Sequence, residues 1–316
     1  MERCPKTSHS SVVVAVTISL FLVTFSSSVR AEQKTIRLLT IGNSFAENAL
    51  TYLPSLVESA GHKLVVGRAN LGGCTLERHW KHAQQFEADP DGKEGSPYGG
   101  GKYSLKDLLT KDRWDFITIQ QVSYTSHDLQ TYQPFANNLH RYIREHAPDA
   151  TILVHQIWAY RSDDPRFQTS NEGKEPHTHA VMYDQVRDAY RALAKKLNLN
   201  VLPSGDAMFR ADTDPVWGYR VDDQFDFENA SYPNLPDQKH SLHVGWSWKK
   251  RDDARRELGI DGHHASSAGK YLLGCVWFET LYNENVIGNH FVPVGLDPEY
   301  ANFLQQTAHV TVSGGT

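Results

Sequence analysis

Two short motifs at opposite ends of the chain contain residue types that together can form a hydrolytic site. An apolar run over residues 36–41 is followed by Gly42-Asn43-Ser44-Phe45, which places a serine directly after a predicted strand. Far along the chain, Asp261-Gly262-His263-His264 precedes an apolar helical pattern and offers a carboxylate three residues before an imidazole. A serine, a histidine and an aspartate can act together as nucleophile, base and orienting group, whatever their order in the sequence.

Ser44 is predicted to lie on the turn between the first strand and the first helix. Ligands of open α/β sheets bind outside the carboxyl ends of the strands. The free backbone N–H groups of a helix N-terminus can also stabilise an oxyanion. The alternative is that Asn43 or Ser44 only caps the helix, and this motif alone favours the cap. The motif is not the Gly-x-Ser-x-Gly elbow of α/β-hydrolases, because Ala46 replaces the second glycine.

The second motif is expected to lie on a turn before a helix. There, a spacing of three residues lets the Asp261 carboxylate reach one ring nitrogen of His264 while the other nitrogen points outward, and a catalytic base needs such a partner. Asp261 has an alternative role as a plain turn residue, because Asp-Gly favours turns. His263 is the competing imidazole, and we expect it to point away or to contact substrate.

The order and spacing of these motifs resemble the SGNH (GDSL-like) hydrolase superfamily, in which the serine lies in the first block and Asp-x-x-His in the last. More narrowly, Ile41–Phe45, Gly72–Trp80 and Ile119–Gln121 resemble a secreted bacterial branch, the DUF4886 group. The resemblance implies an α/β three-layer sandwich, flavodoxin-like, with a mainly parallel five-stranded sheet flanked by helices. It also implies acyl transfer by Ser44, His264 and Asp261 without a cofactor.

The resemblance further implies hydrogen-bond donors for an oxyanion in addition to the Ser44 N–H. Gly72 or Gly73 after the second strand fits one of them, because a glycine backbone can approach substrate closely; a plain turn glycine is the alternative. The superfamily has a Gly-x-Asn-Asp block after the third strand, where this chain has Gln120-Gln121-Val122-Ser123. Gln121, with Gln120 in reserve, is predicted to donate from its side-chain amide instead of the asparagine.

Other polar and aromatic residues are weaker candidates. The segments His177-Thr178-His179 and His240-x-x-His243 suggest metal binding, but neither has a carboxylate at the fixed spacing of a metalloenzyme motif. We therefore predict no metal. Helix packing explains Arg78, and core packing explains Trp158, as well as a substrate contact does. Four residues are predicted to line the substrate site: Asn43, Arg78, Trp158 and His263.

Strand-like runs alternate with helical patterns, which predicts a parallel sheet with helices on both faces. Pro54 is expected to kink the first helix. Residues 207–260 break the rhythm but are rich in aromatic side chains, which predicts an ordered insertion beside the site. The expected strands are 36–41, 63–69, 116–120, 151–157 and 200–203; the expected helices are 46–57, 76–86, 105–109, 135–145, 181–197 and 267–282.

Residues 1–31 have the pattern of a secretory signal peptide. Arg3 and Lys6 precede an apolar run over residues 12–25, and Ser28–Ala31 resembles a cleavage site. An uncleaved anchor is the alternative, although the run is short for a membrane span. Residues 32–316 are predicted to form a single domain.

The chain after residue 31 is acidic. The whole sequence has 32 Lys+Arg and 37 Asp+Glu, of which three basic and one acidic residue lie in 1–31, so the remainder has a formal charge of −7. Nucleic acid is excluded as a partner, because phosphate binding needs a basic face. Cys74 and Cys275 remain after the leader. Export permits a disulfide between them, but two buried thiols are the favoured interpretation.

Together these observations predict a secreted or periplasmic serine esterase that acts on a small or carbohydrate ester and has no stable membrane association once the leader is cleaved. The acidic composition, the export signal and the aromatic insertion suggest a carbohydrate ester such as an acetylated polysaccharide. One alternative is a non-catalytic carbohydrate-binding protein on the same fold, which the missing Gly-x-Asn-Asp block favours mildly. Another is a metal-dependent hydrolase that uses the histidine pairs.

Overall fold

The computed structural model describes residues 1–6, 32–168, 176–252 and 255–314 of the chain. Most of the predicted signal peptide, residues 7–31, lies outside the described residues. The chain divides into two units, Met1–Glu32 and Gln33–Thr316, and every described helix and strand belongs to the second. Within the described ranges, no helix is both long and apolar enough to cross a membrane.

A parallel sheet of five strands lies at the centre of the second unit, in the order β2-β1-β3-β4-β5. The carboxyl half of β1 is completely buried, as expected for a strand covered by helices on both faces. The predicted strands agree with the observed ones to within two residues at each end. These are β1 (Thr35–Gly42), β2 (Lys63–Asn70), β3 (Phe116–Ile119), β4 (Thr151–His155) and β5 (Asn200–Leu202).

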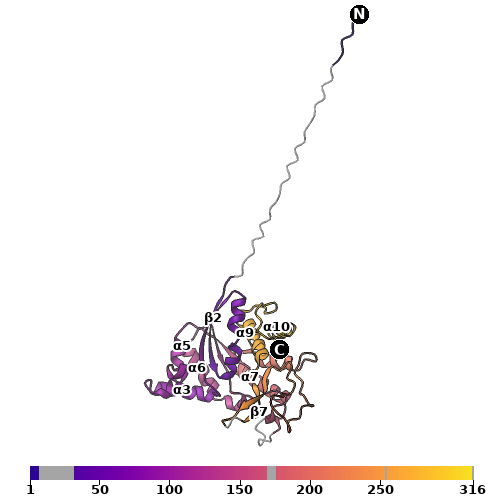
Figure 1. Ribbon diagram of the computed structural model, residues 1–316. Helices are drawn as coiled ribbons and strands as arrows, with labels where there is room; N and C mark the ends of the chain where they lie inside the picture. Colours follow the sequence, from indigo (N-terminus) through magenta and orange to yellow (C-terminus); the bar gives the residue numbers. More distant parts are fainter. Residues whose placement is uncertain (7–31, 169–175, 253–254, 315–316) are drawn as a thin grey trace. The chain divides into compact units, whose positions relative to one another are not determined.

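Helices cover both faces of this sheet. Right-handed crossovers place the helices after β1 and those after β2 on opposite faces, because the chain reverses its direction across the sheet at β2. Figure 1 shows α3, α5 and α6 on one side, with α9 and α10 on the other. The first group is α3 (Leu76–Ala88), α5 (Leu105–Thr110), α6 (Phe135–His146) and α7 (His179–Leu197); the second is α1 (Ser44–Leu50), α2 (Leu53–Ser59), α8 (Ser204–Asp212), α9 (Ser267–Tyr282) and α10 (Pro298–Ser313).

The helix predicted over residues 46–57 is divided into α1 and α2. Pro54 occupies the first turn of α2, where its missing N–H costs no hydrogen bond, whereas inside a continuous helix its ring would clash with the preceding turn. The predicted kink is therefore a complete break. α1 is left as a short helix that begins at Ser44 and points its N-terminus at the carboxyl edge of the sheet.

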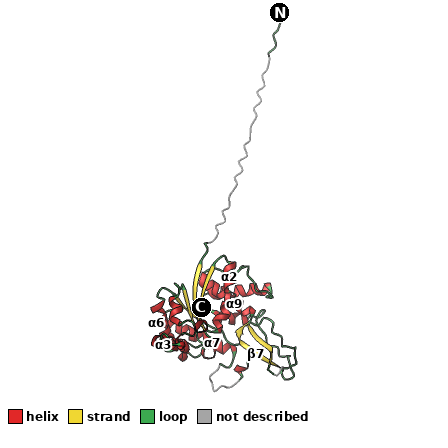
Figure 2. Cartoon of the chain, turned by 60° about the vertical axis from the view of Figure 1, so that its left-hand side comes forward, coloured by secondary structure: helices red, strands yellow, loops and turns green. Residues whose placement is uncertain are grey.

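The aromatic insertion contains regular structure that the sequence analysis did not predict. The end of α8 falls in it, as do β6 (His243–Lys250) and the start of β7 (Arg256–Ala265), and these two strands form an antiparallel hairpin. This hairpin is separate from the five-stranded sheet, and Figure 2 shows β7 at a distance from the main strands. The remaining short elements are η1 (Lys93–Gly95), α4 (Tyr98–Gly101), η2 (Ser123–Thr125), η3 (Leu129–Tyr132) and η4 (Pro165–Phe167).

The hairpin is fixed to the segment after β4 by a buried ion pair. The Arg161 guanidinium, 1% exposed, donates to both carboxylate oxygens of Asp163 at 2.5 and 2.7 Å. Trp246 of β6 donates its indole N–H to Asp163, 2.9 Å away. Gln238 accepts from Arg161 and from the Trp246 backbone. The insertion is thus ordered against the carboxyl edge of the sheet, and it brings β7 to that edge.

Candidate active site

The turn after β1 presents Ser44 and depends on the residues beside it. A Cβ added at Gly42 would lie 2.7 Å from the Gln120 side chain, so only glycine fits at the end of β1. Asn43 caps α1, and its Oδ1 accepts from the Phe45 N–H at 3.0 Å. Its Nδ2 donates to the Cys74 carbonyl at 3.1 Å, which joins this turn to the loop after β2. Ser44 itself is half-exposed, whereas its neighbours Asn43 and Phe45 are buried.

Ser44, His264 and Asp261 form a continuous hydrogen-bonded relay. His264 Nε2 lies 2.9 Å from Ser44 Oγ, and His264 Nδ1 lies 2.9 Å from Asp261 Oδ2. A carboxylate can only accept, so Nδ1 bears the proton, and neutral Nε2 accepts from the serine hydroxyl. Two motifs separated by 220 residues are thereby brought into the geometry of nucleophile, base and orienting carboxylate.

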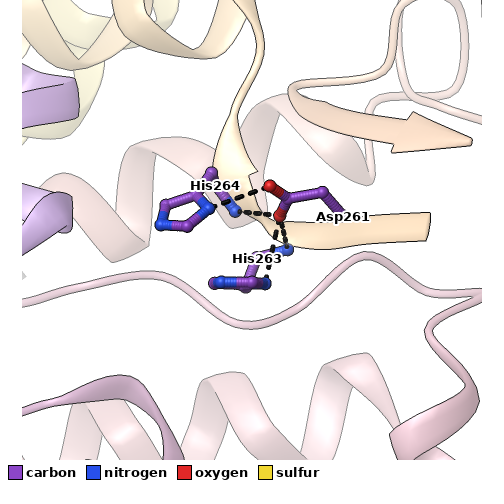
Figure 3. A group of neighbouring side chains, drawn as sticks. All are labelled: Asp261, His263 and His264. Carbon is purple, nitrogen blue, oxygen red and sulfur yellow. Dashed lines mark hydrogen bonds and ion pairs between the residues drawn. The ribbon is translucent and has the colours of Figure 1, made fainter. Parts of the chain in front are cut away.

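Asp261 and His264 lie on β7 and not on a free turn, which corrects the expected local structure. The Asp261 carboxylate nevertheless folds back on its own strand, because Oδ1 accepts from the backbone N–H groups of His263 and His264 at 3.3 and 3.0 Å. Figure 3 shows the carboxylate between the two imidazoles, with the Nε2 edge of His264 facing away from it. An antiparallel strand anchored to a hairpin restricts this motif more than a turn would.

Two hydrogen bonds from outside the hairpin hold the backbone around the catalytic histidine. Asn48 on α1 accepts from the Ala265 N–H at 2.7 Å. Trp158, in the segment after β4, donates its indole N–H to the His263 carbonyl at 2.9 Å. Each of these bonds satisfies a backbone group that is shielded from water, so both favour this one position of the strand. The helix that presents the serine and the segment after β4 therefore both position the histidine.

Gly262, between the aspartate and the two histidines, is held in the same way and allows a close contact. Its carbonyl accepts from the Arg161 N–H at 2.8 Å. A Cβ at this position would lie 2.2 Å from Asp164 Oδ2, so a glycine is required here. Asp164 is almost completely buried and forms a bidentate pair with Arg166, with distances of 2.8 and 2.6 Å. The centre of the motif is thus packed directly against the buried carboxylate of this ion pair.

Four residues that position this motif were not predicted from the sequence: Asn48, Arg161, Asp164 and Arg166. Two features of the sequence point to them. Asn48 lies one helical turn after Ser44 and therefore on the same face of α1. The three charged residues follow β4 at the carboxyl edge of the sheet, where the site of an open α/β sheet is expected.

The electrostatics of the motif keep its carboxylate ionised. Burial alone would raise the pKa of the Asp261 carboxyl, but the hydrogen bonds from the His264 side chain and backbone lower this pKa well below its ordinary value. Burial, followed by the proximity of His264, lowers the pKa of His263 to about 4. At neutral pH, His263 is therefore a neutral imidazole beside a charged carboxylate.

The loop after β2 offers backbone donors beside Ser44. Gly73 has a positive φ of 58°, and a Cβ added at Gly72 or Gly73 would meet no atom within 4 Å. Both glycines are exposed. Among the described residues, the N–H groups of Ser44, Gly72 and Gly73 donate no hydrogen bond. Free N–H groups on two adjacent turns are suitable donors for an oxyanion.

The two glutamines do not provide the expected third donor. Gln121 Oε1 accepts from the Leu76 and Val122 N–H groups at 3.1 and 2.9 Å, and its Nε2 donates to Thr131. Gln120 is 2% exposed and donates to Asn43 Oδ1 at 2.8 Å. Both amides are used to join loops beneath the site, so we remove them from the candidate oxyanion hole.

The predicted substrate-binding residues also need correction. Asn43 is 1% exposed and Trp158 is fully buried against Phe45, with ring centroids 4.4 Å apart, so neither side chain lines an open surface. His263 does not point away, because its Nδ1 lies 3.0 Å from Asp261 Oδ1, but its side chain is 32% exposed and remains a candidate for contact with substrate. Arg78 is exposed on the first turn of α3 and remains a candidate for contact with substrate.

The histidine pairs considered for a metal do not converge on one. His179 donates from Nδ1 to the Tyr160 carbonyl, and His243 donates from Nε2 to the Ala159 carbonyl. Among the described residues, the group whose ligand atoms lie within 4.8 Å of one another is Asp261, His263 and His264. The hydrogen bond between Asp261 and His264, and the distance of 3.0 Å from His263 Nδ1 to Asp261 Oδ1, account for this closeness. Cys74 and Cys275 are both free and buried, so they form no disulfide.

Comparisons with known proteins identify the family. The model of the domain of unknown function DUF4886 matches residues 37–232, more than half of the chain, so the chain belongs to this family. The matched range contains Ser44 and ends before Asp261. A crystal structure of a DUF4886 family protein from Bacteroides uniformis ATCC 8492 is similar at 26% identity and a TM-score of 0.66, over 88% of this chain and 95% of that one.

Two lipolytic proteins are among the weaker structural similarities. A member of the lipolytic protein G-D-S-L family from Veillonella parvula DSM 2008 has 10% identity and a TM-score of 0.41, over 79% of this chain and all of that one. The psychrotrophic esterase EstA from Pseudoalteromonas sp. has 11% identity and a TM-score of 0.34, over 57% and 82% of the two chains. At these scores neither says anything about the activity of this chain. No curated protein matches it.

Proposed function

We propose that this member of the DUF4886 family is a serine-dependent carboxylic-ester hydrolase. The observation that supports the proposal most strongly is the relay from Ser44 Oγ through His264 to Asp261, with both distances at 2.9 Å. A helix cap would explain a serine at this position, but it would not explain an imidazole directed at the hydroxyl and held by a carboxylate.

The reaction proceeds in two acyl-transfer steps. Ser44 Oγ attacks the ester carbonyl while His264 Nε2 takes the hydroxyl proton, and Asp261 stabilises the imidazolium that results. The imidazolium then gives this proton to the leaving alcohol, and the acyl group remains on Ser44. Water attacks the acyl-enzyme with His264 again as base, which releases the acid and restores the serine hydroxyl.

The N–H groups of Ser44 and of Gly72 or Gly73 stabilise the oxyanion in both steps. Among the described residues, these N–H groups donate no hydrogen bond, and the open space above the two glycines leaves room for a substrate oxygen. Backbone donors are preorganised, because the turns that hold them are joined by the bond from Asn43 to Cys74. The proposal includes no metal and no cofactor.

The proposed substrate is a carbohydrate ester, and the proposed location is outside the cytoplasm, either secreted or periplasmic. The pattern of residues 1–31 supports export. A hollow of about 530 Å³ supports a sugar, because Ser266 and Ser267, which directly follow β7, line it together with Trp217 and His240. These rings lie 5.0 Å apart, and such aromatic faces can stack on a sugar ring.

Hydrolysis of p-nitrophenyl acetate by residues 32–316 tests the chemistry. The wild type should be active, and Ser44→Ala should reduce kcat/KM by at least about a thousandfold. Ser313→Ala, which changes an exposed serine at the end of α10, is the matched control and should retain activity. Equal background rates in the wild type and folded Ser44→Ala would reject the hydrolase and favour the non-catalytic carbohydrate-binding protein.

Acetylated xylan tests the substrate class separately. Trp217→Leu should weaken hydrolysis of the polysaccharide by about tenfold while hydrolysis of p-nitrophenyl acetate changes little, since stacking on one aromatic ring contributes roughly 1 kcal/mol or more. Equal losses on both substrates would indicate that Trp217 only supports the fold, and activity on the small ester alone would reject the carbohydrate substrate.

A further inference from the structure

The carbonyl of Gly42, two residues before Ser44, accepts hydrogen bonds from two different parts of the chain. The Leu71 N–H, in the loop after β2, lies 3.0 Å from this oxygen and extends the pairing of β1 with β2. His79 Nε2 on α3 lies 3.0 Å from the same oxygen. The first bond already gives the buried carbonyl a partner. The second donor therefore has a role beyond satisfying this oxygen.

The protonation of His79 follows from its two partners. A carbonyl oxygen can only accept, so Nε2 bears a proton and donates to Gly42. Burial lowers the pKa of this fully buried imidazole to about 3, so the ring is neutral at ordinary pH and its Nδ1 is an acceptor. The Tyr98 hydroxyl, 2.9 Å from Nδ1, is therefore the donor in the second contact. Tyr98 thus fixes the tautomer with which His79 holds the Gly42 carbonyl.

His79 also connects the two segments whose N–H groups are proposed to bind the oxyanion. Ser44 begins α1 just beyond Gly42, whereas Gly72 and Gly73 precede α3, and His79 lies in the first turn of α3. A hydrogen bond from this turn to the carbonyl at the end of β1 restricts the distance between the two sets of donors. An oxyanion hole depends on such distances, because its donors must be in place before charge develops.

Packing alone does not account for the pair of His79 and Tyr98. Both side chains are fully buried, and their rings stack with centroids 5.9 Å apart and an angle of 14° between the planes. Two apolar side chains would fill the same space without burying a hydroxyl and two ring nitrogens, which costs free energy unless each is hydrogen-bonded. Here each of these groups is bonded, and the series of bonds ends on the Gly42 oxygen.

We propose that His79, held by Tyr98, is a positioning residue: it joins the turn that bears Ser44 to α3 and so keeps the Ser44 N–H and the Gly72 or Gly73 N–H at the spacing that an oxyanion requires. The effect on catalysis rests on the proposed function, whereas the effect on the turn does not. Because His79 is fully buried, it cannot touch substrate. Its loss should therefore weaken stabilisation of the transition state more than binding of the ester.

Three substitutions test these hydrogen bonds. His79→Gln keeps a donor for the carbonyl and an acceptor for the tyrosine, whereas His79→Leu removes both. In His79→Leu we expect kcat for p-nitrophenyl acetate to fall about thirtyfold with KM changed by less than about twofold, and His79→Gln should recover most of this loss. Tyr98→Phe removes a single oxygen and keeps the ring, so it should fold, and we expect kcat to fall about fivefold.

Tyr271→Phe is the matched control for Tyr98→Phe. Tyr271, on α9 beside α10, is also fully buried, and its hydroxyl donates to the Phe291 carbonyl at 2.9 Å. This variant should lose a similar amount of stability and keep its kcat. Equal losses of kcat in the two tyrosine variants would overturn the proposal, as would an unchanged kcat in folded His79→Leu. A His79→Gln variant no more active than His79→Leu would also overturn it.

Amide NMR of the same proteins separates this proposal from the proposed function. The backbone N–H signals of the three proposed oxyanion donors should shift or broaden in folded His79→Leu and, to a smaller extent, in Tyr98→Phe, but not in Tyr271→Phe. If no form hydrolyses any ester and the signals change in this way, the proposed function fails and the connection between the turn and α3 remains. Unchanged signals in His79→Leu would overturn the proposal, whatever the activity.

Discussion

His264 on β7 and His243 on the adjacent strand β6 each face an aspartate, and the two pairs differ in distance, access and hydrogen bonding. His264 lies 2.9 Å from Asp261, whereas His243 Nδ1 lies 3.7 Å from Asp212, beyond hydrogen-bond distance. The first pair is half-exposed and the second is buried. Residue type and proximity alone would make both pairs candidates for a catalytic base.

The hydrogen bonds of each pair explain why only one suits proton transfer. Nδ1 of His264 donates to Asp261, which leaves Nε2 free to accept from Ser44. In the buried pair, His243 Nε2 must be the donor because it faces the Ala159 carbonyl at 3.0 Å. Its Nδ1 therefore directs a lone pair at Asp212, and among the described residues this nitrogen and Asp212 Oδ1 have no hydrogen-bond partner.

The pKa values of the two carboxylates are consequently shifted in opposite directions. Hydrogen bonds hold the pKa of Asp261 well below its ordinary value despite burial. Burial raises the pKa of Asp212 to about 7, although Arg161 opposes the change. The comparison shows that donors around the carboxylate, and not the neighbouring imidazole alone, decide whether an aspartate remains charged enough to support a base.

The sharpest test of the comparison replaces one histidine of each pair. His264→Ala should lower kcat/KM by at least about a thousandfold with the fold intact, since it removes the base. His243→Gln keeps a donor for the Ala159 carbonyl and should change kcat/KM by less than about fivefold at a temperature where the protein is folded. Steady-state kinetics on p-nitrophenyl acetate measure both. Comparable losses in the two variants would remove the distinction between the pairs.

Replacing Gln121 is expected to have a smaller effect than replacing His264, and to lower stability more than catalysis. Gln121→Ala leaves the buried Leu76 and Val122 N–H groups without their acceptor. The free energy of unfolding should fall by about 2–3 kcal/mol, which corresponds to roughly 5 °C in Tm. kcat/KM of the folded variant should stay within about threefold. A hundredfold loss of activity at unchanged Tm would instead restore Gln121 as an oxyanion donor.

The last prediction concerns Asp212, whose effect on stability depends on pH. The folded-state pKa of about 7 exceeds the ordinary value of 3.8, so the folded protein holds a proton that the unfolded chain releases. Asp212 therefore lowers stability increasingly as pH rises from about 4 to 7, and fully above 7. Asp212→Asn should gain about 2.5 kcal/mol relative to the wild type between pH 5 and pH 8. Urea denaturation of both proteins at pH 5 and at pH 8 measures their free energies of unfolding. If the difference between the variant and the wild type is the same at both pH values, the pKa shift of Asp212 is disproved.

The regular part of the fold could be predicted from the sequence because its strands and helices have clear periodicity. The hairpin could not, since β6 alternates only after an irregularity between His243 and Gly245. α10 was missed although Asp297-Pro298 is a typical helix start, and Asp297 does cap it. The order of Ser44 and the Asp-x-x-His motif predicted residues that the structure brings together, because these motifs are local.

The remaining features of the site depend on contacts that no local pattern contains. Gln121 follows β3 as an oxyanion donor would, but its amide is taken by Thr131 and by the start of α3. Trp158 and Asn43 were expected at the surface of the site and lie beneath it. Whether an amide or a ring faces substrate is decided by which distant backbone groups need a partner, and this is known only from the fold.

The most direct test of the account is covalent labelling of residues 32–316 with a fluorophosphonate, followed by peptide mass spectrometry. Such a reagent reacts with a serine that has been activated by a base. We predict close to one label per chain, located on Ser44, in the wild type and in Ser313→Ala, and none in folded His264→Ala. Absence of label on Ser44 in the wild type, or equal labelling without His264, would contradict the proposal that these residues form a catalytic relay.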